Sequence, residues 1–119
     1  MKDYSAMSDF EINKAVAIHF GMKPFDEKTG WQGLTKEPYV DVIVSGAGRL
    51  GAFNPCNNPA DAYPIMIEHG IGIDYDGISW TASDWRENKH SDWRNHPEHP
   101  LRLAMIVFLM MKEGNADAE

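Results

Sequence analysis

A long apolar run near the C-terminus places the first constraint on the fold. All nine residues from Leu103 to Met111 are apolar. Pro100 suits the first position of a helix and Gly114 suits a stop, so we predict a helix over residues 100–113. Because this helix is apolar nearly all round, it must be buried on more than one side. The run is about half the length of a membrane span, which favours a core helix over a membrane helix.

Length and charge limit the remaining possibilities. The chain has 119 residues, 43% of them hydrophobic, which is enough for one domain over residues 1–119 and too little for two. Eighteen acidic residues against eleven basic ones give a net charge of -7, which disfavours a nucleic-acid partner. Cys56 is the only cysteine and the N-terminus has no apolar signal region, so we expect a protein of the reducing cytoplasm.

Local patterns predict four further elements. Ser8 and Glu11 form a capping box at the start of a helix over residues 9–20. Residues 39–44 are rich in β-branched side chains and predict a strand. A helix over residues 59–68 follows, with Pro64 expected to kink or divide it. Residues 71–82 predict a hairpin with a two-residue turn at Asp76 and Gly77, in which Tyr75 pairs with Ile78 and Ile73 with Trp80.

The segment 45–51 has the spacing G-x-G-x-x-G directly after the predicted strand. In a dinucleotide-binding unit the third glycine would lie at the start of a helix, whereas Pro55 and Pro59 interrupt the chain where that helix would run. We therefore interpret the segment as a flexible connection. Arg49 is the residue in it that could meet an anion directly.

The central block from Phe53 to Pro64 concentrates asparagine and proline. Asn58 is a good helix N-cap, and Asp61 can return a hydrogen bond to the backbone amide of that cap. Spare amide and carboxylate groups at a helix start can bind either the protein's own loops or a ligand, and the sequence leaves both open. We expect Arg102, near the start of the last helix, to pair with Asp61 or with a bound anion.

Three other groups of residues are candidates for chemistry. The sequence Ser-Asp-Trp-Arg occurs twice and supplies Trp85 and Trp93, which either anchor the sheet or form a binding surface. The spacing of His90, His96 and His99 matches no structural zinc site, so we expect neither a metal nor a cofactor. Cys56 lies just before a helix start, a position that can lower the pKa of a thiol, but no spacing ties a histidine to it.

Three blocks resemble the phage NinX family. These are residues 4–17, residues 53–65 with their unusual Cys-Asn-Asn-Pro-Ala-Asp-Ala sequence, and residues 100–111. The resemblance implies a small phage protein without an assigned activity. The layout is more distantly similar to phage α/β/α-sandwich domains, which implies an α+β fold with a small antiparallel sheet and helices packed on it in layers.

The leading hypothesis is a non-catalytic phage protein that binds a small, nucleotide-like anionic ligand, for instance a signal of the host's defence. Its pocket would lie between subunits of a possible homo-oligomer. The expected ligand-binding residues are Asn57, Asn58, Asp61, Arg49, Arg102 and Trp85. One alternative is an inhibitor or adaptor that acts on a host protein through exposed tryptophans. The other is an enzyme that uses Cys56.

Overall fold

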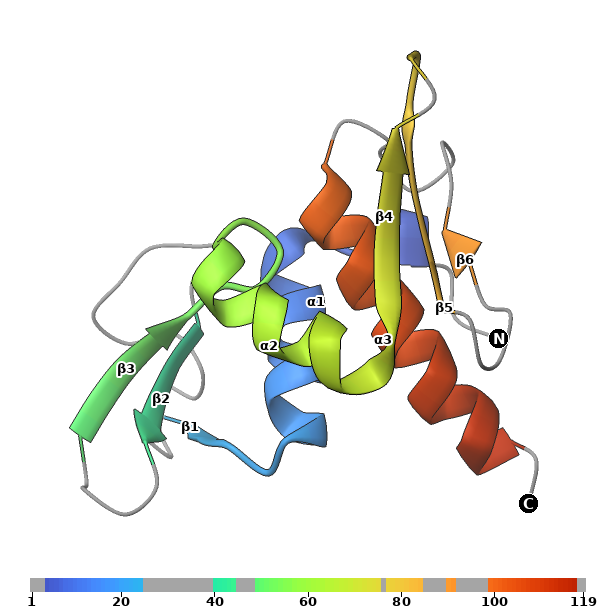
Figure 1. The fold of residues 1–119 in the computed structure, drawn as a ribbon. Coiled ribbons are helices and arrows are strands. Elements are labelled where there is room, and N and C mark those ends of the chain that lie inside the picture. Colours follow the sequence, from blue (N-terminus) through green and yellow to red (C-terminus); the bar gives the residue numbers. More distant parts are fainter. Residues whose placement is uncertain are drawn as a thin grey trace.

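The computed structural model describes residues 4–24, 40–44, 49–75, 77–84, 90–91 and 99–117. They form helices and antiparallel sheets, which confirms the predicted α+β class (Figure 1). The elements follow in the order η1 (Tyr4–Ala6), α1 (Asp9–His19), β1 (Lys23–Pro24), β2 (Val40–Val44), β3 (Arg49–Phe53), α2 (Pro59–His69), β4 (Ile71–Tyr75), β5 (Trp80–Asp84), β6 (His90–Ser91) and α3 (Pro100–Asp117).

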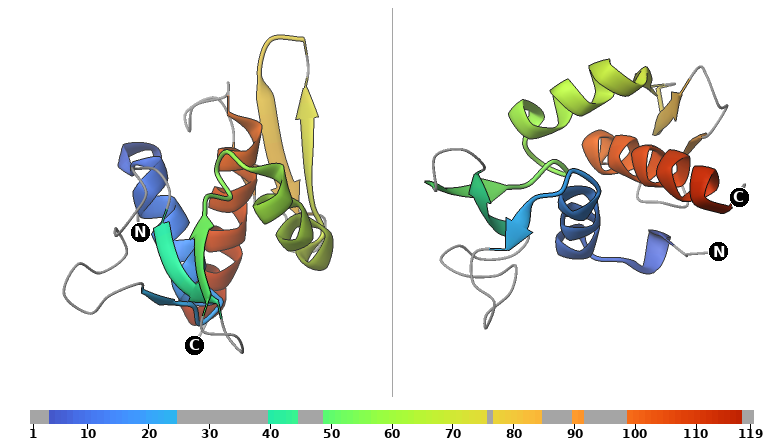
Figure 2. Two further views of the ribbon diagram at one scale, coloured as in Figure 1. Left: turned by 90° about the vertical axis from the view of Figure 1, so that its left-hand side faces the viewer. Right: turned by 90° about the horizontal axis from the view of Figure 1, so that it is seen from below.

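Helix α3 is the centre of the fold. It contacts α1, α2 and all three strands of the sheet β4–β5–β6. The view from below shows α1 and α2 on opposite sides of α3 (Figure 2). Every residue from Arg102 to Leu109 is buried, as the apolar run predicts. The helix continues past Gly114, where we predicted its end, because a glycine costs a helix only about 1 kcal/mol relative to alanine and does not break its hydrogen bonds.

The described strands form two sheets of three strands each, in the orders β1–β2–β3 and β4–β5–β6. Figure 1 shows them at opposite ends of the molecule with the helices between them. Val40 and Val42 of β2 are buried in the core, in agreement with the strand predicted over residues 39–44. The two sheets therefore close the two ends of a helical core.

The start of α1 has the predicted capping box. The Ser8 hydroxyl oxygen accepts a hydrogen bond from the Glu11 backbone N–H at 3.1 Å, and the Glu11 carboxylate accepts one from the Ser8 N–H at 3.1 Å. The backbone hydrogen bond from Ser8, followed by its side-chain hydrogen bond, lowers the pKa of the exposed Glu11 carboxyl. The capping box therefore holds α1 best while Glu11 is ionised.

We predicted that Pro64 would kink or divide helix α2. The helix runs from Pro59 to His69 with Pro64 inside it, so it is not divided. Proline removes the hydrogen bond to the carbonyl of the residue four positions earlier, Ala60. Both residues are exposed, so water can bond this carbonyl. Gly70 ends the helix in the left-handed conformation, with a φ of 68°.

The register predicted for the hairpin is wrong by two residues. Tyr75 pairs with Trp80, and Ile73 with Ala82, so a four-residue connection replaces the two-residue turn. A shift of two keeps the same side chains on the same face of the sheet. It brings the rings of Tyr75 and Trp80 to 5.1 Å between centroids and leaves Ile78 90% exposed. The hairpin extends beyond the helices (Figure 2).

Besides the two-residue strand β6, two further strands were not predicted. Part of the glycine-rich segment belongs to β3, which pairs along its whole length with β2. A strand therefore follows these glycines, and the absence of a helix at β3 agrees with our rejection of a dinucleotide-binding loop. The second is β1, which adds Lys23 and Pro24 to the same sheet where we expected only a loop.

Candidate functional site

The central asparagine block joins β3 to α2 and packs against α1. The side-chain amide of Asn13 donates a hydrogen bond to Asn54 Oδ1 at 2.7 Å, and Asn13 Oδ1 accepts one from the Cys56 N–H at 3.0 Å. Asn13 and Asn54 are both buried. A buried amide that lost these partners would cost about 1–3 kcal/mol, so these bonds fix the block against α1.

Asp9 connects the starts of the three helices. One of its carboxylate oxygens accepts from the Arg102 guanidinium of α3 at 2.5 Å, and the other accepts from Asn57, just before α2, at 3.2 Å. Arg102 also donates to the backbone oxygens of Tyr4 at 3.0 Å and Met7 at 2.6 Å. The expected pairing of Arg102 with Asp61 is therefore not found, and Asp9 is its partner. We call Asp9, Asn13, Asn54, Asn57 and Arg102 the helix-start network.

The cap of α2 is partly as predicted. Asn58 Oδ1 accepts from the Ala60 N–H at 3.0 Å, so Asn58 is the N-cap. The carboxylate of Asp61 does not take the cap's backbone amide. It accepts instead from the Asn54 N–H at 2.9 Å and from the Asn58 side-chain amide at 3.3 Å. Asp61 thereby ties the helix to the chain that precedes it, which a pattern within the helix could not predict.

Cys56 is unsuited to nucleophilic chemistry in this structure. Its side chain is buried, with Sγ 3.9 Å from the backbone oxygen of Asp9. Burial, and secondly the negative charge of Asp9, raise the pKa of the Cys56 thiol well above its ordinary value, while Arg102 lowers it. A thiol that stays protonated and buried is a poor nucleophile at neutral pH.

The structure brings four of the predicted ligand-binding residues into one region, namely Asn57, Asn58, Asp61 and Arg102. Arg49 begins β3, and only its backbone is described. Trp85, Trp93 and His96 lie outside the described residues, while His90 begins β6 and His99 precedes α3. A cavity of about 260 Å³ borders the network and is lined by Met7, Ser8, Asp9, His99 and Arg102.

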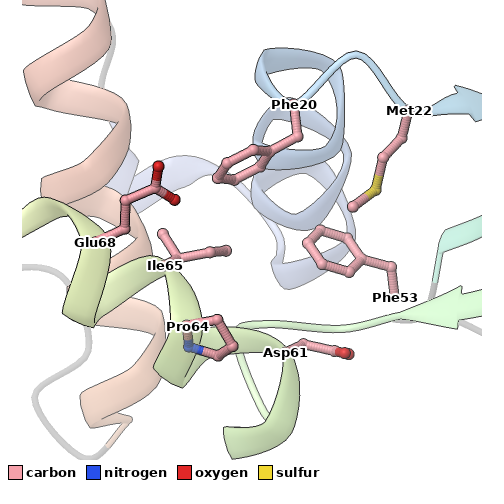
Figure 3. Close-up of a pocket in the computed structure, with 7 residues that line it drawn as sticks. All are labelled: Phe20, Met22, Phe53, Asp61, Pro64, Ile65 and Glu68. Atoms are coloured by element: carbon pink, nitrogen blue, oxygen red, sulfur yellow. The ribbon is translucent and has the colours of Figure 1, made fainter.

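A second cavity, of about 220 Å³, lies beside α2. It is lined by Phe20, Met22, Phe53, Asp61, Pro64, Ile65 and Glu68, whose side chains converge on one space (Figure 3). Tyr63 and Ile67 lie on the exposed side of the same helix, 62% and 64% exposed. The sequence offered one indication of this surface, since α2 has apolar residues on two faces while only the face of Ala62, Ile65 and Met66 is buried.

A comparison with protein families agrees with the resemblance that the three sequence blocks suggested. The family described as Bacteriophage P22, NinX matches residues 3–112. The chain belongs to the NinX family. No curated protein matches the sequence.

The NinX match covers both the helix-start network and the α2 cavity, and it confirms the resemblance found in the sequence. Membership in the NinX family indicates a phage accessory protein. In the described part of the chain, no helix is long and apolar enough to span a membrane.

Proposed function

We propose that this NinX-family chain is a non-catalytic binding protein that docks a host protein on helix α2. The observation that supports it is the exposure of Tyr63 and Ile67, one helical turn apart on the same helix that lines the α2 cavity. We call Tyr63, Ile67 and the residues that line this cavity the α2 surface. Side chains four residues apart share one face of a helix, so the two form one apolar ridge.

The composition of the α2 surface favours a protein partner. Tyrosine is enriched among the residues that dominate binding energy at protein interfaces. The cavity of about 220 Å³ is smaller than the 300–1,000 Å³ typical of sites for drug-sized ligands. An apolar ridge on the same helix as a small cavity suits a partner that covers the ridge and inserts one side chain.

The charge of the cavity lining supports a particular kind of partner. The charged residues that line the α2 cavity among those described, Asp61 and Glu68, are both acidic, and the whole chain has a net charge of -7. Complementary potentials accelerate association and exclude wrong partners. The proposed partner is therefore a host protein whose binding surface is basic around an apolar centre.

A catalytic role has no support among the described residues. The buried thiol of Cys56 has a raised pKa, and among the described residues its polar neighbours are the backbone oxygen of Asp9 and groups of the helix-start network. Nothing in this arrangement would take a proton from Cys56 or admit a substrate to it.

The second candidate is the small, nucleotide-like anionic ligand, with sequestration of a host defence signal as its purpose. Its support is the cavity of about 260 Å³ beside Arg102, and the Nε of Arg102, which is buried and has no acceptor among the described atoms. The cavity would hold a phosphoryl group rather than a whole nucleotide. A second copy of the chain would then hold the rest of the ligand, in a homo-oligomer.

Two measurements test these candidates together. Tagged wild-type protein and a Tyr63→Ser/Ile67→Ser variant are used to capture host proteins from lysate, with Ile78→Ser as the control. Ile78 is more exposed than either residue but lies at the hairpin, away from α2. Docking predicts a host protein that the wild type and the control retain and the double variant loses. Retention by all three proteins, or by none, contradicts it.

Native mass spectrometry of the same preparations addresses the second candidate. A releasable small mass that carries phosphate supports anionic ligand binding. An apo protein that also fails to bind added AMP contradicts it.

A further inference from the structure

We infer that the α2 cavity takes one large apolar side chain of the partner together with an adjoining lysine or arginine. The identity of this occupant as a protein segment rests on the proposed function. The preference for an apolar group that carries a positive charge rests on the cavity itself.

The apolar wall of the cavity is formed before anything binds. Phe20 is 40% exposed, yet its ring stacks on the buried ring of Phe108 at 5.2 Å between centroids and 5° between planes. Phe53 and Ile65 are buried and belong to the core. Because the core already orders these side chains, a ligand that enters the cavity would cost little further conformational entropy.

The size of the cavity limits its occupant. A volume of about 220 Å³ exceeds by several times the roughly 30 Å³ that one water occupies in the liquid. It lies below the range of about 300–1,000 Å³ found for larger ligands. One aromatic or long aliphatic side chain fits these limits.

The polar groups at the cavity are acidic at both ends. Asp61 and Glu68 are seven residues apart on α2, or roughly 10 Å along the helix axis. Figure 3 shows their carboxylates on either side of the apolar side chains. Both hydrogen bonds that Asp61 accepts come from uncharged donors, the Asn54 N–H and the Asn58 amide. These bonds leave its charge in place, and Arg102 pairs with Asp9 instead.

This arrangement selects by charge. An apolar group with a carboxylate or phosphate would meet two like charges, whereas one with an ammonium or guanidinium would meet two opposite ones. A cation beside the partly exposed ring of Phe20 would gain a further contact with its π face. The α2 cavity thus favours a cationic ligand, whereas the cavity beside Arg102 was proposed to bind an anionic one.

Three small probes with the same ring test this preference. They are phenethylamine, 2-phenylethanol and phenylacetate, titrated into the whole protein while backbone amide shifts are followed by NMR. We expect phenethylamine to bind about tenfold more tightly than phenylacetate, with the alcohol between them, and the shifted amides to lie in α2 and at Phe53. Equal binding, preference for phenylacetate, or no shift in these amides would overturn the inference.

Two matched variants separate charge from shape. Glu68→Gln keeps the shape of the side chain and removes one charge. We therefore expect the ratio of the two affinities, phenethylamine over phenylacetate, to fall by a factor of about two to three; we call this ratio the gap. Asp74→Asn removes an exposed charge from β4, outside the cavity lining, and should leave the gap unchanged. An unchanged gap in Glu68→Gln would contradict the role of its carboxylate.

Salt gives a test without mutation, because exposed charges are screened. Raising salt from about 0.05 M to about 0.5 M should narrow the same gap. A gap that does not respond to salt would show that charge does not set the preference.

The outcomes also separate this inference from the proposed function. If the probes behave as expected and partner capture does not depend on Tyr63 and Ile67, the docking proposal fails and only the preference of the cavity stands. If capture depends on these two residues and the probes show no charge preference, docking stands and this inference fails.

Discussion

The helix-start network and the α2 surface differ in the polarity of their side chains. The network collects asparagines, an aspartate and an arginine, and its members bond mainly to one another and to the backbone. The α2 surface collects apolar side chains, and two of them, Tyr63 and Ile67, are mostly exposed to solvent. The more polar of the two regions is therefore the one whose groups are already engaged within the chain.

This difference bears on how a site is recognised. Buried polar groups must be hydrogen-bonded, so a dense polar motif in the core first satisfies itself. The exposed apolar side chains of Tyr63 and Ile67 satisfy no other group among the described residues in this way and leave apolar area in water. The contrast supports our proposal that the network stabilises the fold while α2 binds a partner, and each of the following changes tests that division.

The largest effect is expected from Arg102→Met. Arg102 is only 3% exposed, and the substitution removes the partner of Asp9 and the donor to two backbone oxygens. Loss of one member of a buried ion pair typically costs about 3–5 kcal/mol, and urea denaturation would measure it. Arg102→Lys, which keeps the charge without the fork of donors, should lose less. A loss below about 1 kcal/mol in Arg102→Met would remove the structural role assigned to the network.

A smaller effect should appear at alkaline pH through Cys56. Its thiol has a raised pKa in the folded protein, so it stays protonated while the thiol of the unfolded chain ionises above a pKa of about 8.5. The unfolded state then binds fewer protons, and stability falls as pH rises, by up to about 1.4 kcal/mol per pH unit. Below the pKa of the unfolded thiol this contribution is fully present.

The control for this effect is a variant that lacks the thiol, compared with the wild type across the same pH range. Cys56→Ala should lower stability at neutral pH and flatten its decline above pH 8.5. Urea midpoints of both proteins across this range would show the difference in slope. Equal slopes would mean that Cys56 is open to solvent in the folded state.

The sequence predicted elements whose causes are local. The capping box of Ser8 and Glu11, the N-cap Asn58 and the apolar run of α3 each depend on residues close in the chain, and all three are found. The predicted register of the hairpin was wrong. Asp76 and Gly77 favour a tight turn locally, whereas the observed register brings Tyr75 opposite Trp80. Local turn chemistry was a weaker determinant than cross-strand packing.

The candidate site was the least predictable part because it depends on contacts distant in sequence. Asp9 and Arg102 are 93 residues apart, and no spacing rule relates them. The α2 cavity joins Phe20, Phe53 and Ile65, three ordinary apolar residues that nothing marks as neighbours. Motifs in a sequence therefore locate helix starts, whereas a cavity between elements can be found only once the elements are packed.

The smallest effect on stability is expected from Tyr63→Ser/Ile67→Ser. Both side chains are more than half exposed, and surface substitutions away from caps and buried contacts usually change stability by less than about 0.5 kcal/mol. Urea denaturation of this variant should therefore overlay that of the wild type, although partner capture is lost. A loss above about 2 kcal/mol would mean that the ridge packs against the fold, and the same variant could then no longer distinguish a binding surface from a structural one. The Ile78→Ser control, at a more exposed apolar residue, measures the change in stability that such a substitution causes where no partner is proposed.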